Sequence, residues 1–149
     1  MWKSFQRKAR RARELSFADW LALTEAWFAL FAFYFAVRWM SYARLSAAPN
    51  IEPNPSAALA DARRLQRLVG WAARAHLLPM TCLVQSLSLR GMLARRGIGS
   101  ALRIGAAKDP RGFHAHAWLE VDGEKVGESE DVEGLFHVLR GGTSPPTTS

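Results

Sequence analysis

The sequence has little cysteine: Cys82 is the only one among its 149 residues. A single thiol excludes a framework of internal disulfides and any zinc site built from several cysteines. The chain also contains no glycine-rich phosphate-binding loop and no internal repeat, which excludes P-loop and solenoid architectures. What is present is 49% hydrophobic and 22% charged residues, a composition typical of one globular domain with its own core.

Long apolar runs without a charge are also missing. The longest, Ala26–Val37, has 12 residues, because Glu25 interrupts the apolar segment that begins at Trp20. A bilayer-spanning helix needs about 20 apolar residues, and no small-residue cleavage site of a signal peptide follows Arg38. The segment therefore predicts a helix that packs in the core, on a partner or on a membrane surface. Ser16 is its expected N-cap.

The net charge of +7 is distributed unevenly. Residues 1–15 hold six basic side chains against one acidic side chain, whereas residues 120–133 hold seven carboxylates against one lysine. This asymmetry predicts electrostatic partners for the two ends of the chain. Nucleic-acid-binding surfaces instead interleave aromatic and basic residues, so no nucleic-acid partner is expected. We expect the basic arm to lie in the cytoplasm.

Proline, glycine and charge divide the chain into segments. A basic arm (residues 1–15) and an apolar helix (16–45) precede a linker (46–56), in which prolines oppose regular structure. The main domain is expected to cover residues 57–140, followed by a flexible tail (141–149).

Apolar residues at intervals of three and four predict a second helix from Ser56 to about Leu78, ended by Pro79. Its basic side chains are expected to form a solvated face; they are Arg63, Arg64, Arg67 and Arg74.

A third helix is predicted after Pro79, with Thr81 as its N-cap and Gly97 as a left-handed C-terminal cap. Cys82 then falls in the first turn of this helix. There the free backbone N–H groups and the positive end of the helix dipole favour the nucleophilic thiolate.

The rest of the domain predicts antiparallel strands. Alternation of side chains indicates strands over Ser100–Ala107 and His114–Val121, joined by a turn at Lys108–Gly112. A tight turn at Asp122–Gly123 leads to a return strand, Glu124–Glu128. One face of the second strand is small and apolar. The opposite face carries His114, His116, Trp118 and Glu120.

A cysteine at a helix start, followed by strands that carry a histidine, indicates an α+β fold suited to cysteine catalysis. Such catalysis needs an imidazole near the thiolate and an acceptor that orients the imidazole. With a two-residue turn, Glu128 and Glu130 neighbour His116 across the ladder, and the register decides which shares its face. Asp122 lies roughly 20 Å from His116 along a straight strand.

A metal site is not expected. Cys82, His114 and His116 lack a convincing fourth ligand. His76 and His137 are expected to be structural or to face solvent. The proposed chemistry needs no metal and no organic cofactor.

The run TCLVQSLSLRGMLARRGIGSALRIGAA, followed by HAHAWLEVDGEKVGE, resembles the stand-alone leader peptidase of lasso-peptide biosynthesis. The pattern is a cysteine before Leu-x-x-Ser-Leu, an Arg-Arg-Gly helix end and an Ala-His-Ala-Trp strand, over about residues 60–139. The resemblance implies a transglutaminase-like fold related to papain-type cysteine proteases, with helices on a small antiparallel sheet and an apolar helix in front.

The resemblance also implies roles for individual residues. Cys82 matches the nucleophile and His116 the general base. Glu128 occupies the place of the third member, usually aspartate, on the strand after the hairpin, and Asp122 is the alternative. The implied reaction removes the leader from a ribosomally made precursor peptide.

Three partners are implied: the precursor, a separate leader-recognition protein and an ATP-dependent cyclase. The cyclase joins the newly exposed α-amine to an acidic side chain of the core peptide. A separate recognition protein is also expected because little of the chain precedes residue 60. Two other functions stay open. One is an acyltransferase that uses the same Cys82–His116 pair, and the other is a non-enzymatic scaffold whose apolar helix docks on a membrane or on the cyclase.

Overall fold

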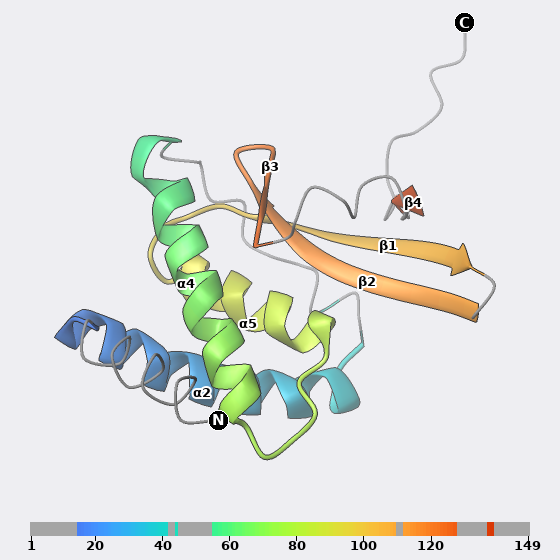
Figure 1. Ribbon diagram of the computed structural model, residues 1–149, viewed down its shortest axis with the longest axis horizontal. Helices are drawn as coiled ribbons and strands as arrows, with labels where there is room; N and C mark the ends of the chain where they lie inside the picture. Colours follow the sequence, from blue (N-terminus) through green and yellow to red (C-terminus); the bar gives the residue numbers. More distant parts are fainter. Residues whose placement is uncertain (1–14, 42–43, 45–54, 110–111, 128–136, 139–149) are drawn as a thin grey trace, which may run out of the picture.

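The structure is a computed structural model that describes residues 15–41, 44, 55–109, 112–127 and 137–138. The described helices all lie on one side of an antiparallel sheet (Figure 1), which confirms the predicted α+β class. The elements are α2 (Phe17–Trp39), α4 (Pro55–Ala75), α5 (Cys82–Ala94), β1 (Ala101–Asp109), β2 (Gly112–Val121), β3 (Glu124–Val126) and β4 (His137–Val138). Most of the basic arm, the linker up to residue 54 and the tail 141–149 lie outside the described residues.

A capping box starts α2 at the predicted residue. The Ser16 hydroxyl accepts a hydrogen bond from the Asp19 backbone N–H (3.2 Å), and the Asp19 carboxylate accepts one from the Ser16 N–H (2.9 Å). Hydrogen bonds from Ser16 and then from Arg64 of α4 (2.6 Å) lower the pKa of Asp19. The helix ends at Trp39, earlier than the predicted residue 45, and Met40 is its extended C-cap.

The inner face of α2 is made mostly of small side chains, which bring it close to α4 and α5. The buried residues of this face are Ala22, Ala26, Ala29 and Leu30. Phe33 adds a ring that lies against α5 where Gly91 leaves room, because a Cβ at Gly91 would approach Phe33 to 3.1 Å. Glu25 then binds two arginines at the end of α5, Arg95 at 2.8 Å and Arg96 at 2.6 Å.

The α4 helix begins at Pro55, one residue before the predicted start. Proline is tolerated in the first helical turn because its missing N–H has no intrahelical acceptor there. The helix ends at Ala75 rather than at Leu78. The residue before Pro79 is disfavoured from helical geometry, and the Leu78 N–H instead donates to His76 Nδ1 (3.4 Å).

The predicted caps of α5 are both confirmed. Thr81 is the N-cap, and its hydroxyl accepts a hydrogen bond from the Val84 N–H (3.4 Å). Gly97 is left-handed (φ 70°). The bond from the Ile98 N–H to the Leu93 carbonyl (3.0 Å) completes a Schellman-type ending.

The strand order of the sheet is β3-β2-β1-β4. The β2–β3 hairpin has the predicted two-residue turn, since Val121 pairs with Glu124. Positive φ angles at Asp122 (53°) and Gly123 (80°) indicate a type I′ turn. Among the described residues, the pairing of β3 with β2 runs to Val126, and the predicted strand end Glu128 lies outside them. The β4 strand, which pairs with β1, had no signal in the sequence.

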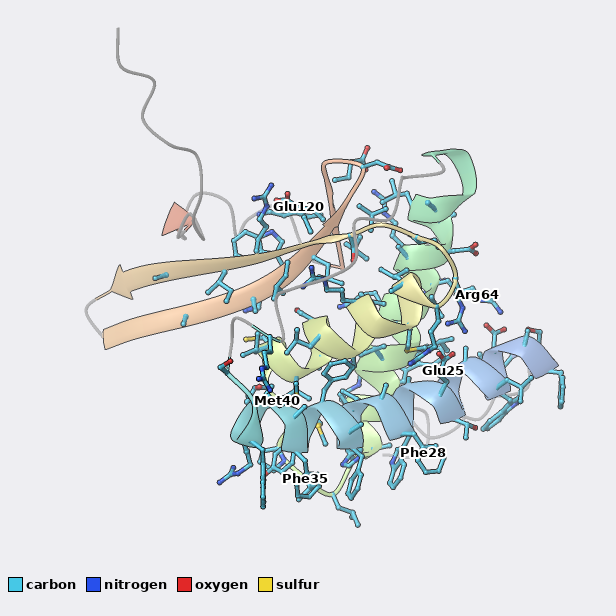
Figure 2. The ribbon with its side chains drawn as sticks, turned by 180° about the vertical axis from the view of Figure 1, so that it is seen from behind. Glu25, Phe28, Phe35, Met40, Arg64 and Glu120 are labelled. Carbon is cyan, nitrogen blue, oxygen red and sulfur yellow. The ribbon has the colours of Figure 1, made fainter. Side chains whose placement is uncertain are left out.

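The core lies between α2, the pair α4 and α5, and one face of the sheet. Figures 1 and 2 show α2 on the side of α4 and α5 that faces away from the sheet. From the sheet, Leu119, Val121 and Val126 join the apolar cluster of the helices. Trp118 is also buried (3% exposed), although its side chain belongs to the opposite face of β2. Both faces of this strand are therefore covered at its centre.

By length and composition α2 could cross a membrane, but the core helix of a soluble protein or a signal sequence can be equally long and apolar. Its ion pairs with α4 and α5 instead make it part of the folded body.

Glu25→Gln should lower the free energy of unfolding by about 0.5–1 kcal/mol at pH 7. Hydrogen bonds from Arg96 and Arg95 lower the pKa of Glu25 from its ordinary value of 4.5. The stabilisation is therefore present above that value and is lost as the pH falls through the lower pKa of the folded state. Urea unfolding of both proteins between pH 7 and pH 3 should show the difference shrinking as Glu25 becomes protonated.

Glu124→Gln is the control, because Glu124 and its partner Arg63 are 60% and 54% exposed and such pairs contribute little. Equal effects of the two substitutions at pH 7 would contradict a role of Glu25 in holding α2 on α5.

Candidate active site

Cys82 is the first residue of α5, directly after the N-cap Thr81. The thiol is half-buried, and it is the only one in the chain. The first backbone N–H groups of a helix have no acceptor within the helix and point toward its start. Gln85 fixes the preceding segment, because its side-chain amide donates to the Met80 carbonyl (2.9 Å). The cysteine is thus held at a helix start, as predicted.

A buried hydrogen bond joins this helix to β2 beside His116. The Ser86 hydroxyl, one turn after Cys82, donates to the backbone carbonyl of Ala117 (3.0 Å). This bond fixes the first turns of α5 against the strand at the residue next to His116. In β2, His116 pairs with Gly105 of β1, which carries no side chain.

One pocket contains both predicted catalytic residues. It has a volume of about 250 Å³ and lies between α4, the start of α5 and the middle of β2. Cys82 and His116 both line it. Two residues more than 30 positions apart in sequence are thereby brought to the same cavity. The other lining residues are Gln66, Gln85, Ser86, Leu89, Ala117, Trp118, Leu119 and Val126.

His116 is half-buried, and its ring stacks near that of Trp118, with centroids 6.1 Å apart and planes at 21°. The Lys125 ammonium lies 4.8 Å from the Trp118 ring centroid. The indole Nε1–H of Trp118 is buried and has no hydrogen-bond partner in the described part of the chain. The pocket is therefore walled by an imidazole, an indole and a thiol.

The two carboxylates considered as third member have different positions. Glu128 lies outside the described residues, directly after Gly127. Val126, two residues before Glu128, lines the pocket of Cys82 and His116. Asp122 is exposed at the tip of the hairpin and does not line that pocket.

Sequence reasoning missed the contribution of α4 to this pocket. Gln66 of α4 lines it and lies against Gly127, where an added Cβ would come within 2.3 Å of the Gln66 side chain. Gly127 also has a left-handed φ of 89°. The sequence contained a weak signal, the glycine after β3, but nothing indicated which side chain occupied the space.

The part of the chain that the structure describes contains no cluster suited to a metal ion. Among the described residues, no group of three or more potential ligands is close enough to hold a metal ion. His76 stacks on Trp27, with ring centroids 4.7 Å apart, which agrees with a structural role. The side chains of His114 and His137 lie outside the description.

Comparison with known families gives one match. The family model of the transglutaminase-like superfamily matches residues 27–140, which is most of the chain. Neither a curated protein nor a solved structure gives a significant match. The matched range begins within α2 and includes Cys82, the whole of β2 and Glu128. The chain therefore belongs to the transglutaminase-like superfamily, which includes cysteine proteases and acyltransferases.

Proposed function

We propose that this protein is a cysteine peptidase that removes the leader from a ribosomally made lasso-peptide precursor. The observation that carries the proposal is the single pocket lined by Cys82, at a helix start, and His116. Among the reactions of the superfamily, the resemblance of the cysteine and histidine motifs to stand-alone leader peptidases supports this one. A separate leader-recognition protein and an ATP-dependent cyclase are the proposed partners, in the cytoplasm.

The reaction follows from the groups in the pocket. His116 takes the thiol proton, and the Cys82 sulfur attacks the scissile carbonyl. The developing oxyanion accepts hydrogen bonds from backbone N–H groups at the start of α5. The tetrahedral adduct collapses, the C–N bond breaks, and His116 protonates the departing α-amine. Water, activated by the same imidazole, then hydrolyses the acyl-enzyme, so no metal or organic cofactor takes part.

Glu128 is the proposed third member. The chain passes along the pocket at Val126 and reaches Glu128 two residues later. A carboxylate there would accept the second N–H of the His116 imidazole and stabilise the imidazolium. Asp122 is less suited, since it lies exposed at the hairpin tip, six residues along β2 from His116.

The same thiol and imidazole would also serve an acyltransferase, in which an amine replaces water in the second step. The mass of the product distinguishes the two reactions. Hydrolysis adds the mass of water to the acyl fragment, and transfer to glycinamide adds the mass of that amine.

Cys82→Ala should abolish leader removal, with a fall of about 10³-fold or more, because the thiol that forms the acyl-enzyme is lost. The other hydroxyl that lines the pocket, that of Ser86, is held in its hydrogen bond to the Ala117 carbonyl. The measurement is mass spectrometry of the precursor incubated with the recognition protein and the variant. Ser88→Ala is the matched control in the same helix, since Ser88 donates to the Val84 carbonyl and does not line the pocket. Cleavage at the wild-type rate by folded Cys82→Ala protein would refute the peptidase mechanism.

Glu128→Gln should lower kcat by about 10²–10⁴-fold, because a neutral amide cannot stabilise the imidazolium of His116. Asp122→Asn should stay within about threefold of the wild type. Single-turnover cleavage assays on both variants provide the test, and a larger loss for Asp122→Asn would move the role to the hairpin tip.

The outer face of α2 supports a further part of the proposal, contact with a membrane surface. Its exposed apolar residues recur at three- and four-residue intervals and form one stripe along the helix. Figure 2 shows Phe28 and Phe35 pointing away from α4 and α5. Thr24, on the same stripe, satisfies its hydroxyl by donating to the Trp20 carbonyl (2.9 Å). The stripe consists mainly of Phe17, Leu21, Phe28, Phe31, Phe35 and Trp39.

The charge near this stripe favours contact with an anionic lipid surface over contact with a protein. Six basic residues against one acidic residue directly precede α2, and Arg38 lies in its last turn. Aromatic side chains flanked by basic residues are typical of helices that lie in the membrane interface. The inner face of α2 is ion-paired to the protein body, so the helix would lie flat on the bilayer rather than cross it.

The full chain should sediment with vesicles of phosphatidylcholine containing 30% phosphatidylglycerol, and less with phosphatidylcholine alone. Phe28→Ser/Phe35→Ser should weaken this partitioning about tenfold or more, because two exposed rings would no longer enter the interface. Ala32→Ser, an exposed position of the same helix, is the control and should bind like the wild type.

A different outcome would assign the stripe to a protein. No sedimentation with either vesicle, together with a complex with the purified cyclase that Phe28→Ser/Phe35→Ser weakens, would overturn the membrane proposal.

A further inference from the structure

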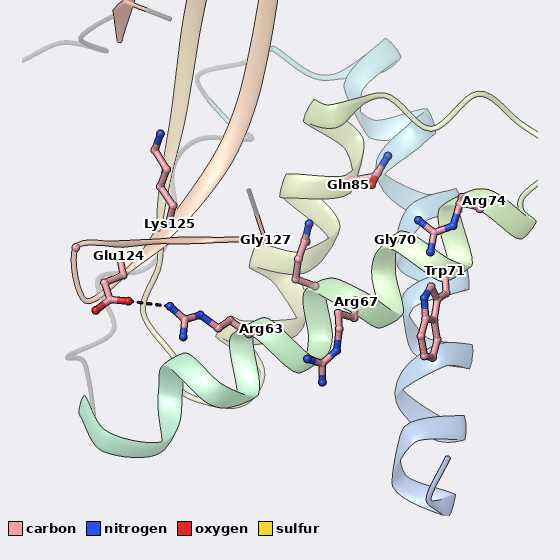
Figure 3. A pocket seen from close by; sticks show the side chains of 11 residues that line it. Arg63, Arg67, Gly70, Trp71, Arg74, Gln85, Glu124, Lys125 and Gly127 are labelled. Atoms are coloured by element: carbon pink, nitrogen blue, oxygen red, sulfur yellow. Dashed lines mark hydrogen bonds and ion pairs between the residues drawn. The ribbon is translucent and has the colours of Figure 1, made fainter. Parts of the chain in front are cut away.

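A second and larger hollow adjoins the candidate active site. It has a volume of about 880 Å³, within the range of about 300–1,000 Å³ found for ligand sites. One wall is α4 and the other is the β2–β3 turn with β3 (Figure 3). We call it the α4 groove. Figure 3 shows Arg63 opposite Glu124 at one end and Arg74 with Gln85 at the other.

The charged side chains along the α4 groove are mainly basic. Arg63 and Arg67 are one helical turn apart on α4, Arg74 follows two turns later, and Lys125 of β3 adds a fourth cation. The one acidic lining residue, Glu124, is bound to Arg63 at 2.9 Å. In the described part of the chain, Arg67 and Arg74 have no ion-pair partner. Of the four arginines predicted to form a solvated face, Arg63, Arg67 and Arg74 are exposed and line one side of the groove, whereas Arg64 binds Asp19 of α2.

Gly70 opens the wall of the groove between Arg67 and Arg74. A glycine within a helix is unfavourable by roughly 0.5–1 kcal/mol relative to alanine. A Cβ at Gly70 would meet only the end of the Arg74 side chain, at 3.7 Å, so packing does not require a glycine here. Because glycine has no side chain, a ligand can approach the helix between the two arginines.

The α4 groove and the Cys82–His116 pocket adjoin each other. Gln66 of α4 and Gln85 of α5 line both cavities. At the strand side, Gly127 lines the groove and the preceding Val126 lines the pocket. A polypeptide with its scissile bond at Cys82 would reach the basic groove by extending past the two glutamines.

We infer that the α4 groove binds an acidic segment of the peptide substrate, next to the bond that Cys82 attacks. This inference rests on the proposed peptidase. Guanidinium groups bind carboxylates through paired hydrogen bonds, and Arg67 and Arg74 present two such groups beside an open helix wall. Trp71, between them, provides an apolar surface for a neighbouring side chain. The position of the groove next to the thiol pocket favours a peptide over a nucleic acid.

Binding of fluorescein-labelled hexaglutamate to the full chain, followed by fluorescence anisotropy, tests the inference without requiring peptidase activity. Arg67→Glu/Arg74→Glu should weaken binding about tenfold or more. Arg38→Glu/Arg44→Glu, exposed residues outside the groove that change the net charge equally, should have little effect. Hexalysine should bind the Arg67→Glu/Arg74→Glu protein more tightly than the wild type, a gain that misfolding would not produce.

The single cysteine gives a second readout. Hexaglutamate should slow the alkylation of Cys82 by iodoacetamide in the wild type, and should not slow it in Arg67→Glu/Arg74→Glu protein. Mass spectrometry of the intact chain measures both rates.

The outcomes separate this inference from the proposed function. If cleavage depends on Cys82 while hexaglutamate binds both charge-reversed proteins equally, the groove inference fails and the peptidase stands. If Cys82→Ala cleaves normally, the peptidase fails whatever the anisotropy shows. Displacement of hexaglutamate by a tenfold lower concentration of single-stranded DNA would overturn the peptide assignment in favour of a nucleic-acid site.

Discussion

The buried hydrogen bond between the Ser86 hydroxyl and the Ala117 carbonyl is the contact on which the candidate site depends. A backbone carbonyl in a packed interior needs a partner, so this bond fixes where α5 meets β2. It lies one helical turn after Cys82 and one residue after His116. Because most of α5 is buried between the other helices and the sheet, the helix start has little freedom to move away from the strand.

The same burial explains why α2 has two different faces. Small inner residues let it pack closely on α4 and α5, and Asp19 and Glu25 anchor it to arginines of those helices. Most of the large aromatic residues of α2 lie on its outer face, because the close packing of the inner face leaves no room for them. The exceptions lie at the edges of the inner face. The helix is consequently apolar on both faces, which is why composition alone gives it the character of a membrane span.

Membership of the superfamily and the geometry of the site carry different parts of the functional argument. The family match establishes a fold used by cysteine proteases and acyltransferases alike. The shared pocket of Cys82 and His116 is compatible with both reactions, since both begin with an acyl-enzyme. The proposed role of the α4 groove would add selectivity, because a peptide that extends into it would meet Arg67 and Arg74, which have no ion-pair partner among the described residues.

The sequence by itself determined the local structure. Short-range rules placed the Ser16 and Thr81 caps, the Gly97 helix end and the Asp122–Gly123 turn, because each depends on a few consecutive residues. The motifs also indicated Cys82 and His116. Only the tertiary structure decided that these two line one cavity, that Gln66 joins them from α4, and that β4 extends the sheet. It also decided that three exposed arginines of α4 line a groove, and that Arg64 instead binds Asp19 of α2. These features arise from contacts between residues far apart in the chain, whose distance and orientation depend on how the helices pack on the sheet.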